Sequence, residues 1–211
     1  MKKLLLLSSL RFLISGNLPP VLGKPFNQFK TAHIITASKG VKDLAYLERN
    51  RVFFKANGYD IEELDLDGKN EKELRKILQD KELVYVEGGN TFYLLKSARE
   101  NGFEQVIKEL LPRGLIYMGA SAGSYLTCPT IETSTWKREH NRYGVTNFTA
   151  LNLVPFLLFV HYRPEHQELV RERIKHASHP VKILTDEQAL LVEGNDVALI
   201  GTDPEVVGEN L

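Results

Sequence analysis

The sequence predicts a three-layer α/β fold, in which a mostly parallel sheet carries helices on both faces. Short apolar runs alternate with amphipathic stretches from one end of the chain to the other. Several of these runs are apolar at every position, which is typical of parallel strands that are buried on both sides. Alternating strands and helices indicate βαβ units, which build a parallel sheet.

Each expected element occupies one of these runs or stretches. The strands are predicted at Leu4–Leu7, Ala32–Thr36, Ile61–Leu64, Leu83–Val86, Leu115–Met118, Leu157–Val160 and Val181–Leu184. The helices are predicted at Val41–Asn57, Glu71–Gln79, Thr91–Leu111 and Glu165–Ala177. The last two apolar runs, Ala189–Val192 and Asp196–Ile200, predict a hairpin, because Glu193-Gly194-Asn195 between them is typical of a tight turn.

Length and charge limit the classes of function. The 211 residues are enough for one large domain and short for two, so we expect a single domain over residues 1–211. Lys+Arg and Asp+Glu number 27 each, which gives a formal net charge of zero. Without an excess of positive charge, the chain has no positive electrostatic field that would attract a phosphate backbone or an anionic membrane. We therefore expect neither nucleic acid nor a membrane among its partners.

The first residues have a superficial likeness to a secretory signal. Lys2 and Lys3 precede the apolar run Leu4–Leu7, but polar residues and Arg11 interrupt that run early, and no clear cleavage site follows. A buried first strand is the better interpretation. The single cysteine, Cys128, fits a reducing compartment, and no stretch approaches the ~20 apolar residues of a membrane helix. We expect a soluble, cytoplasmic protein.

A serine lies in a turn between a predicted strand and a helix. The strand Leu115–Met118 runs directly into Gly119-Ala120-Ser121-Ala122-Gly123, and helix-compatible sequence follows. In this context the motif G-x-S-x-G is typical of a nucleophilic serine, because the sharp turn requires very small residues on both sides. The alternative is a structural turn in which Ser121 only caps the helix. If Ser121 is the nucleophile, the N–H of Ala122 is a natural oxyanion donor.

A second turn has paired glycines. The strand Leu83–Val86 leads to Glu87-Gly88-Gly89-Asn90-Thr91-Phe92. Paired glycines allow the backbone to approach a substrate closely, so Gly89 is a candidate for a second oxyanion donor. Asn90 can cap the next helix, and its amide can also meet a substrate. The chain lacks the glycine patterns of phosphate-binding loops, and the competing interpretation is a plain turn with a helix cap.

A serine nucleophile needs a general base, which is normally a histidine oriented by a carboxylate. His161 directly follows the run Leu157–Val160, which places it at the carboxyl end of a predicted strand. Asp186 and Glu187 follow Val181–Leu184, at the end of another. The chain order serine, histidine, acid differs from the order serine, acid, histidine of the α/β-hydrolases. We therefore expect a different topology.

The remaining histidines do not form a metal-binding motif. His166 follows His161 without the HExxH spacing or any similar ligand pattern. The others are His33 within a strand, His140 in a polar loop, and His176 and His179 at the end of a helix. We expect no metal and no other cofactor.

Three segments together carry a family resemblance. They are Val86-Glu87-Gly88-Gly89-Asn90-Thr91-Phe92 with Leu94-Leu95, Gly119-Ala120-Ser121-Ala122-Gly123, and Cys128-Pro129-Thr130-Ile131. They resemble the family of serine peptidases that contains dipeptidase E (α-aspartyl dipeptidase) and cyanophycinase. The resemblance extends over most of the chain, from the first strand to the final hairpin. It implies a flavodoxin-like fold similar to class I glutamine amidotransferases, with a serine in place of their cysteine.

The resemblance also implies roles for individual residues. Ser121 is similar in position to the nucleophile of the family, His161 to its base, and Glu187 to the acid that orients the imidazole. Asp186 is the alternative acid. Some descriptions of the family place the acid at an aspartate fifteen residues after the serine, but that position is Trp136 here, which cannot accept a hydrogen bond from an imidazole.

Asn90 and Thr91, beside the paired glycines, are expected to bind the substrate. In the aspartyl dipeptidase, an arginine on the helix after the histidine helps to hold the N-terminal aspartate of the substrate. The alignment places Val170 at that position, next to Arg171. Neighbours on a helix point about 100° apart, so Arg171, although a candidate substrate-binding residue, need not reach the same pocket. We therefore expect a weak preference for aspartate.

The expected function is hydrolysis of short peptides through Ser121, His161 and Glu187, with an acyl-enzyme intermediate and with Gly89 and Ala122 as oxyanion donors. One alternative is an isopeptidase similar to cyanophycinase, or a hydrolase of another small amide. Another is a catalytically inactive binding protein on the same scaffold. The expected partner is a short peptide substrate, and the sequence gives no indication of the oligomeric state.

Overall fold

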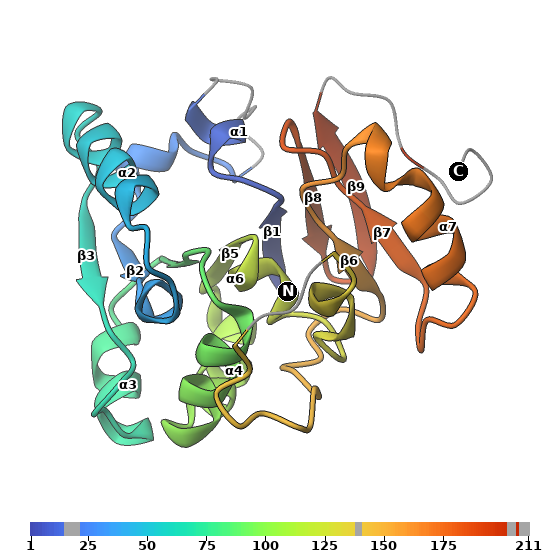
Figure 1. Cartoon of the computed structure of the whole chain (residues 1–211). Coiled ribbons are helices and arrows are strands. Elements are labelled where there is room, and N and C mark those ends of the chain that lie inside the picture. The colour runs from blue at the N-terminus through green and yellow to red at the C-terminus, as the bar shows by residue number, and fades with distance from the viewer. Residues whose placement is uncertain (15–21, 138–140, 202–205, 207–211) are drawn as a thin grey trace.

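The computed structural model describes residues 1–14, 22–137, 141–201 and 206, and its main element is a seven-stranded sheet (Figure 1). The strand order is β3-β2-β4-β5-β1-β8-β9. The first five strands along the chain pair in parallel, and β8 pairs antiparallel with both β1 and β9. Their bounds are β1 (Lys3–Leu7), β2 (Thr31–Ile34), β3 (Ile61–Leu64), β4 (Leu83–Val86), β5 (Ile116–Ala120), β8 (Gln188–Glu193) and β9 (Asp196–Gly201). The predicted α/β class with a mostly parallel sheet is confirmed.

The helices follow the predicted pattern with two differences. Their bounds are α1 (Arg11–Ile14), α2 (Ala45–Ala56), α3 (Glu71–Leu78), α4 (Thr91–Glu100), α5 (Phe103–Leu110), α6 (Ala122–Tyr125) and α7 (Gln167–Ile174). The single helix expected over 91–111 is two helices, because Gly102 takes a left-handed conformation with φ of 71° and ends the helical run between α4 and α5. The short helix α1 was not predicted.

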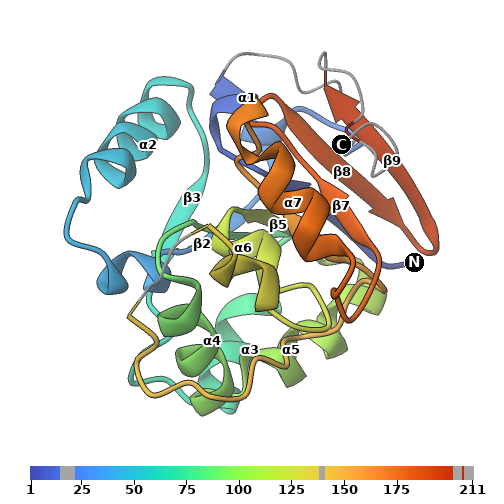
Figure 2. The same cartoon turned by 45° about the vertical axis from the view of Figure 1, so that its right-hand side comes forward.

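Helices cover both faces of the sheet. On β1, the side chains of Leu4 and Leu6 pack with helices α3, α4 and α5 in one buried apolar cluster. Leu5 and Leu7 belong to a second cluster on the other face, together with residues of α1 and α2. This alternation follows from the pleat of a strand, in which successive side chains point to opposite faces. Figure 2 shows α3, α4 and α5 gathered together and α2 apart from them.

Two predicted strands lie outside the main sheet. β6 (Leu157–Phe159) and β7 (Val181–Ile183) pair in parallel only with each other, as a separate two-stranded sheet. Helix α7 packs on this pair, because its Val170 is fully buried against Phe159, Ile183 and Trp136, and Figure 2 shows α7 beside β7. Both runs are strands, as predicted, but they form a sheet of their own.

The topology brings the ends of several strands to one edge of the sheet. Strands β1, β4 and β5 are parallel neighbours, so their carboxyl ends lie together and are followed by Ser8, Glu87 and Ser121. This is the edge where ligands bind in open α/β sheets. No helix in the described part of the chain is long and apolar enough to cross a membrane.

Candidate active site

Ser121 lies in a strained turn between β5 and α6. Its φ of 49° and ψ of −105° are uncommon for a residue with a side chain. Both glycines of the motif are sterically required. A Cβ on Gly123 would lie 2.1 Å from the carbonyl oxygen of Val86, and one on Gly119 would lie 2.6 Å from the backbone of Gly123. The close packing of β5, α6 and β4 therefore explains the spacing of the motif.

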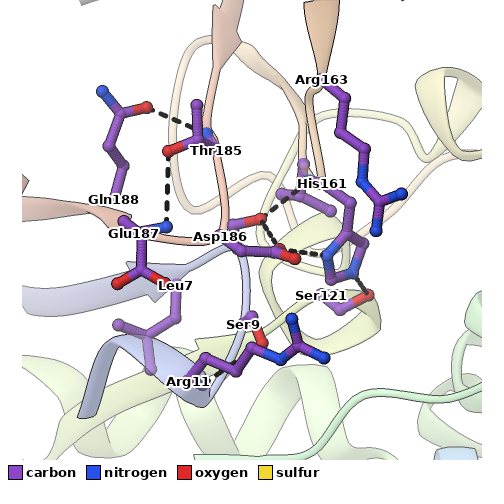
Figure 3. A network of polar contacts seen from close by, with 12 residues as sticks. Leu7, Ser9, Arg11, Ser121, His161, Arg163, Thr185, Asp186, Glu187 and Gln188 are labelled. Carbon is purple, nitrogen blue, oxygen red and sulfur yellow. Dashed lines mark hydrogen bonds and ion pairs between the residues drawn. The ribbon is translucent and has the colours of Figure 1, made fainter. Parts of the chain in front are cut away.

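His161 follows β6 and contacts Ser121. Its Nε2 lies 2.9 Å from Ser121 Oγ, and its Nδ1 lies 2.5 Å from Asp186 Oδ1 (Figure 3). An ionised carboxylate only accepts hydrogen bonds, so Nδ1 carries the proton and Nε2 accepts from the serine hydroxyl. His161 also has a positive φ, of 55°. The two residues that meet at this contact thus both have uncommon backbone conformations.

The structure corrects the expected acid. Figure 3 shows the side chain of Asp186 directed at His161, whereas that of Glu187 points away from it. Asp186 and Glu187 lie in a turn that is held by a hydrogen bond of 3.3 Å from the Gln188 N–H to the Thr185 carbonyl. The Glu187 N–H donates to Thr185 Oγ1 at 3.3 Å. Only one of two adjacent side chains in this turn can face His161, and it is the aspartate.

Two further residues hold the histidine and were not predicted. Ser8, fully buried after β1, donates from its Oγ to Asp186 Oδ1 at 3.0 Å and accepts from the His161 N–H at 2.7 Å. Lys137 donates from its Nζ to the carbonyls of Val160, at 2.5 Å, and His161, at 3.1 Å. A polar residue directly after the first buried strand was a usable signal for Ser8. Lys137 lies in irregular structure, where the periodicity of apolar residues gives no information on where a side chain points.

The carboxyl group of Asp186 is kept ionised by its neighbours. Burial would raise its pKa, but the hydrogen bonds from His161 and Ser8 and the positive charge of Arg11 outweigh burial and lower the pKa below its ordinary value. Asp186 is therefore negatively charged at neutral and mildly acidic pH. A fixed negative charge beside Nδ1 stabilises a positive charge on the imidazole.

Two hollows flank the contact between Ser121 and His161, and both are also lined by Gly89. The larger, of about 690 Å³, lies toward α1 and α2 and is lined by residues that include Arg11, Asp43, Tyr46, Arg49 and Glu87. The smaller, of about 440 Å³, is lined by residues that include Thr91, Tyr125, Ser134, Lys137, Arg163, Glu165 and His166. Ser121 is therefore accessible from two sides.

The other predicted site residues have different surroundings. Gly89 borders both hollows, and Ala122 is the first residue of α6, where an N–H has no partner within the helix. Thr91 lines the smaller hollow. Asn90 is buried as the cap of α4: its Oδ1 accepts from the Tyr93 N–H at 2.9 Å, and its Nδ2 donates to the Asn141 carbonyl at 3.1 Å.

Arg171 lies apart from this site, and so do His33, His176 and His179, whereas His166 lines the smaller hollow. Arg171 contacts Glu168 at 2.5 Å on the surface of α7, and it lines neither hollow in the described part of the chain. His33 binds Glu87 beneath the glycine loop, and His140 lies outside the described residues. Among the residues that the structure describes, no group of three or more His, Cys, Asp or Glu side chains is placed to hold a metal ion.

Comparison with known proteins assigns the family. The family model of "Peptidase family S51" matches residues 4–200, which is nearly the whole chain. The chain belongs to peptidase family S51. It is therefore a peptidase, which confirms the expected enzyme class and the family resemblance of its motifs.

Relatives of this S51 member include peptidases from several bacteria. It is 29% identical over 178 residues to the uncharacterized peptidase Lmo0363 of Listeria monocytogenes, a match that covers 81% of this chain and 85% of the relative. It is 36% identical over 130 residues to the uncharacterized peptidase PM1590 of Pasteurella multocida, covering 61% of this chain and 63% of the relative. Peptidase E of Escherichia coli is 42% identical over 85 residues, which cover 40% of this chain and only 36% of that enzyme.

Solved structures share the fold. A crystal structure from Listeria monocytogenes EGD-e, described as that of a "Putative Peptidase E Protein", superimposes with a TM-score of 0.81 and 26% identity. The match covers 96% of this chain and 100% of that one. A peptidase from an acI-B1 Actinobacterium superimposes with a TM-score of 0.65 at 16% identity, over 96% of this chain and 88% of that one, and supports the fold alone.

Proposed function

We propose that this S51 peptidase is a serine peptidase of short peptides, with Ser121 as nucleophile, His161 as general base and Asp186 as the acid that orients the base. The observation that carries the proposal is the continuous contact from Ser121 Oγ to His161 Nε2, at 2.9 Å, and from His161 Nδ1 to Asp186 Oδ1, at 2.5 Å. Nucleophile, base and orienting acceptor in this geometry form the arrangement that activates a serine hydroxyl.

The proposed reaction begins with attack of Ser121 Oγ on the peptide carbonyl, while His161 Nε2 takes the hydroxyl proton. The carboxylate of Asp186 accepts from Nδ1–H and stabilises the imidazolium. The N–H groups of Gly89 and Ala122 donate to the oxyanion of the tetrahedral intermediate. His161 then gives its proton to the leaving amine, which leaves an ester on Ser121. Water, deprotonated by His161, hydrolyses the ester and restores the enzyme.

The shape of the site supports a small substrate that extends to both sides of the serine. The two hollows have volumes of about 690 and 440 Å³, and both open on Ser121 and His161. Each is within the range of sites that bind small molecules. The residues of a short peptide on either side of the cleaved bond can therefore occupy one hollow each. Relatives named peptidase E support a peptide as the substrate.

A fluorophosphonate probe tests the nucleophile directly. The intact protein should become labelled on Ser121, as located by peptide mass spectrometry, and Ser121→Ala should not be labelled. A panel of dipeptides, isopeptides and small amides then separates a dipeptidase from an isopeptidase or amidase. If the protein is not labelled and hydrolyses none of these compounds, the alternative of a catalytically inactive binding protein is favoured.

We expect a weak preference for peptides with an N-terminal aspartate, with kcat/KM for Asp-X within about tenfold of that for neutral X-X dipeptides. Val170, at the position of the family's aspartate-binding arginine, is fully buried against Trp136 and Phe159 and cannot contact a substrate. The charge-assisted contact between that arginine and the substrate's aspartate carboxylate is missing here, and its loss lowers the selectivity for aspartate by ~10- to 100-fold. Measuring kcat/KM over a dipeptide panel checks this expectation.

The variants Arg171→Ala and Lys137→Met are the informative controls. Arg171 lies on the surface of α7, so its removal should leave the selectivity unchanged. Lys137 lines the smaller hollow, although two of its hydrogen bonds already go to backbone carbonyls. Strict hydrolysis of Asp-X peptides would contradict the expectation. Loss of that strict selectivity in Lys137→Met would then identify the cation responsible.

A further inference from the structure

The peptide bond between Gly88 and Gly89 is held by a side chain from outside its own loop. The Tyr46 hydroxyl, from the first turn of α2, donates to the Gly88 carbonyl at 2.9 Å. The Gly88 N–H donates to Glu87 Oε1, also at 2.9 Å. The Gly88 N–H is therefore already used, and of the two glycine N–H groups only that of Gly89 remains for a substrate oxygen.

The orientation of this peptide decides which atom faces Ser121. A Cβ built on Gly88 would lie 3.3 Å from the Cβ of Ser121, so the loop passes directly over the nucleophile. The described peptides are trans, and in a trans peptide the C=O and N–H groups point in opposite directions. Because Tyr46 holds the carbonyl of Gly88, the N–H of Gly89 points the opposite way within the peptide plane, away from the Tyr46 hydroxyl.

Nothing within the two glycines themselves fixes this orientation. Glycine has no Cβ, so rotation of a peptide between two glycines meets little steric resistance. A rotated peptide would present the carbonyl oxygen of Gly88 in place of the N–H of Gly89, and it would repel an oxyanion. Gly89 already has a φ of 146°, where a residue with a side chain would be strained. The orientation must therefore come from hydrogen bonds to neighbouring groups.

The carboxylate of Glu87 anchors the start of the loop. It is 2% exposed and accepts from Tyr85 Oη at 2.8 Å, Asn50 Nδ2 at 2.8 Å, His33 Nε2 at 3.1 Å and the Gly88 N–H at 2.9 Å. Burial would raise its pKa, but the hydrogen bonds and the nearby His33 lower the pKa below its ordinary value. Four donors thus hold an ionised carboxylate in one position, and Gly88 with it.

Tyr46 keeps its proton, and so remains a donor, across the neutral range. Burial raises the pKa of its hydroxyl, and the carboxylates of Glu87 and Asp43 raise it further. We propose that Tyr46 is a positioning residue, which holds the Gly88–Gly89 peptide with the N–H of Gly89 facing the oxyanion. This inference rests on the proposed function, because it needs an oxyanion to form at Ser121.

The variant Tyr46→Phe removes only the hydroxyl and leaves the ring. We expect kcat for a dipeptide substrate to fall about ten- to a hundredfold, somewhat less than the loss of a whole oxyanion donor, while KM stays within about threefold. We expect kcat to fall without a matching change in KM because the oxyanion exists only during the reaction. Its stabilisation therefore does not contribute to substrate binding. Steady-state kinetics over the dipeptide panel measure both constants.

The matched control is Tyr93→Phe. Tyr93 donates from its hydroxyl to Asp67 Oδ2 at 2.6 Å and lines neither hollow, so its variant also loses one partly buried hydrogen bond. Its kcat should stay within about twofold of wild type. Thermal unfolding of both variants shows whether they lose comparable stability, in which case stability alone does not explain a lower kcat in Tyr46→Phe.

Two results would overturn the inference and leave the proposed function standing. If Tyr46→Phe raises KM and leaves kcat unchanged, Tyr46 contacts the substrate and does not position the loop. If Tyr46→Phe is as active as Tyr93→Phe while Ser121→Ala is inactive, the proposed function stands and the role of Tyr46 is wrong. Activity retained in Ser121→Ala would instead refute the proposed function, and the inference with it.

Discussion

Replacing Ser121 with alanine is expected to lower kcat for peptide hydrolysis by about 10⁴-fold or more, which corresponds to a barrier increase of ~5.5 kcal/mol. In the proposed reaction Ser121 Oγ, 2.9 Å from His161 Nε2, forms the covalent bond to the substrate, and an alanine side chain has no atom that can do so. Alanine keeps the Cβ, so the strained backbone at φ 49° is unchanged by the substitution. The loss should therefore appear in turnover, with an unchanged circular dichroism spectrum and thermal midpoint.

A second serine-to-alanine variant controls for the loss of a hydroxyl. Ser178 is exposed, and its Oγ donates to Glu132 at 2.9 Å, outside both hollows. Ser178→Ala should keep wild-type kcat and KM. If Ser121→Ala kept activity within about tenfold of wild type, ~1.4 kcal/mol of barrier, another residue would have to be the nucleophile.

The sequence predicted the parts of the site that depend on local backbone geometry. The apolar run Leu115–Met118 followed by Gly119 and Gly123 specifies a strand, a sharp turn and a helix, because only glycine fits beside Val86 at that turn. The paired glycines and Asn90 are a similar local signal, and Asn90 does cap α4. Signals of this kind involve neighbours along the chain, so one sequence is enough to read them.

The sequence did not reveal which strands pair. An apolar run indicates that a strand is buried on both faces, but it does not indicate the partner that buries it. The runs that begin at Leu157 and Val181 pair with each other, away from the main sheet, and helix α7 packs against them. For the same reason Ser8 was missed, because its contacts with His161 and Asp186 join segments more than 150 residues apart.

The third residue of the site was misassigned by one position. Asp186 and Glu187 are both carboxylates after the same strand, so composition and strand position do not distinguish them. Their difference arises in the turn at residues 185–188, where adjacent side chains leave the backbone in different directions. The resemblance to the family favoured Glu187, and only the structure shows that Asp186 faces His161.

Asp186→Asn is accordingly expected to lower kcat by about 10²- to 10⁴-fold, whereas Glu187→Gln should stay within about twofold of wild type. Both changes replace a carboxylate by an amide of the same size, so the pair isolates the charge at each position. Asn keeps an oxygen that can accept from Ser8 and His161, but it has no negative charge to stabilise the imidazolium. Steady-state kinetics of the two variants on one dipeptide make the comparison.

The pH dependence sharpens this comparison. Since the pKa of Asp186 lies below its ordinary value, its carboxylate is ionised in the wild type at neutral and mildly acidic pH. The defect of Asp186→Asn should therefore persist throughout that range, where Glu187→Gln follows the wild-type profile. A low kcat in Glu187→Gln together with a wild-type kcat in Asp186→Asn would contradict this assignment. The turn at residues 185–188 would then have to rearrange to bring the Glu187 carboxylate to His161 Nδ1.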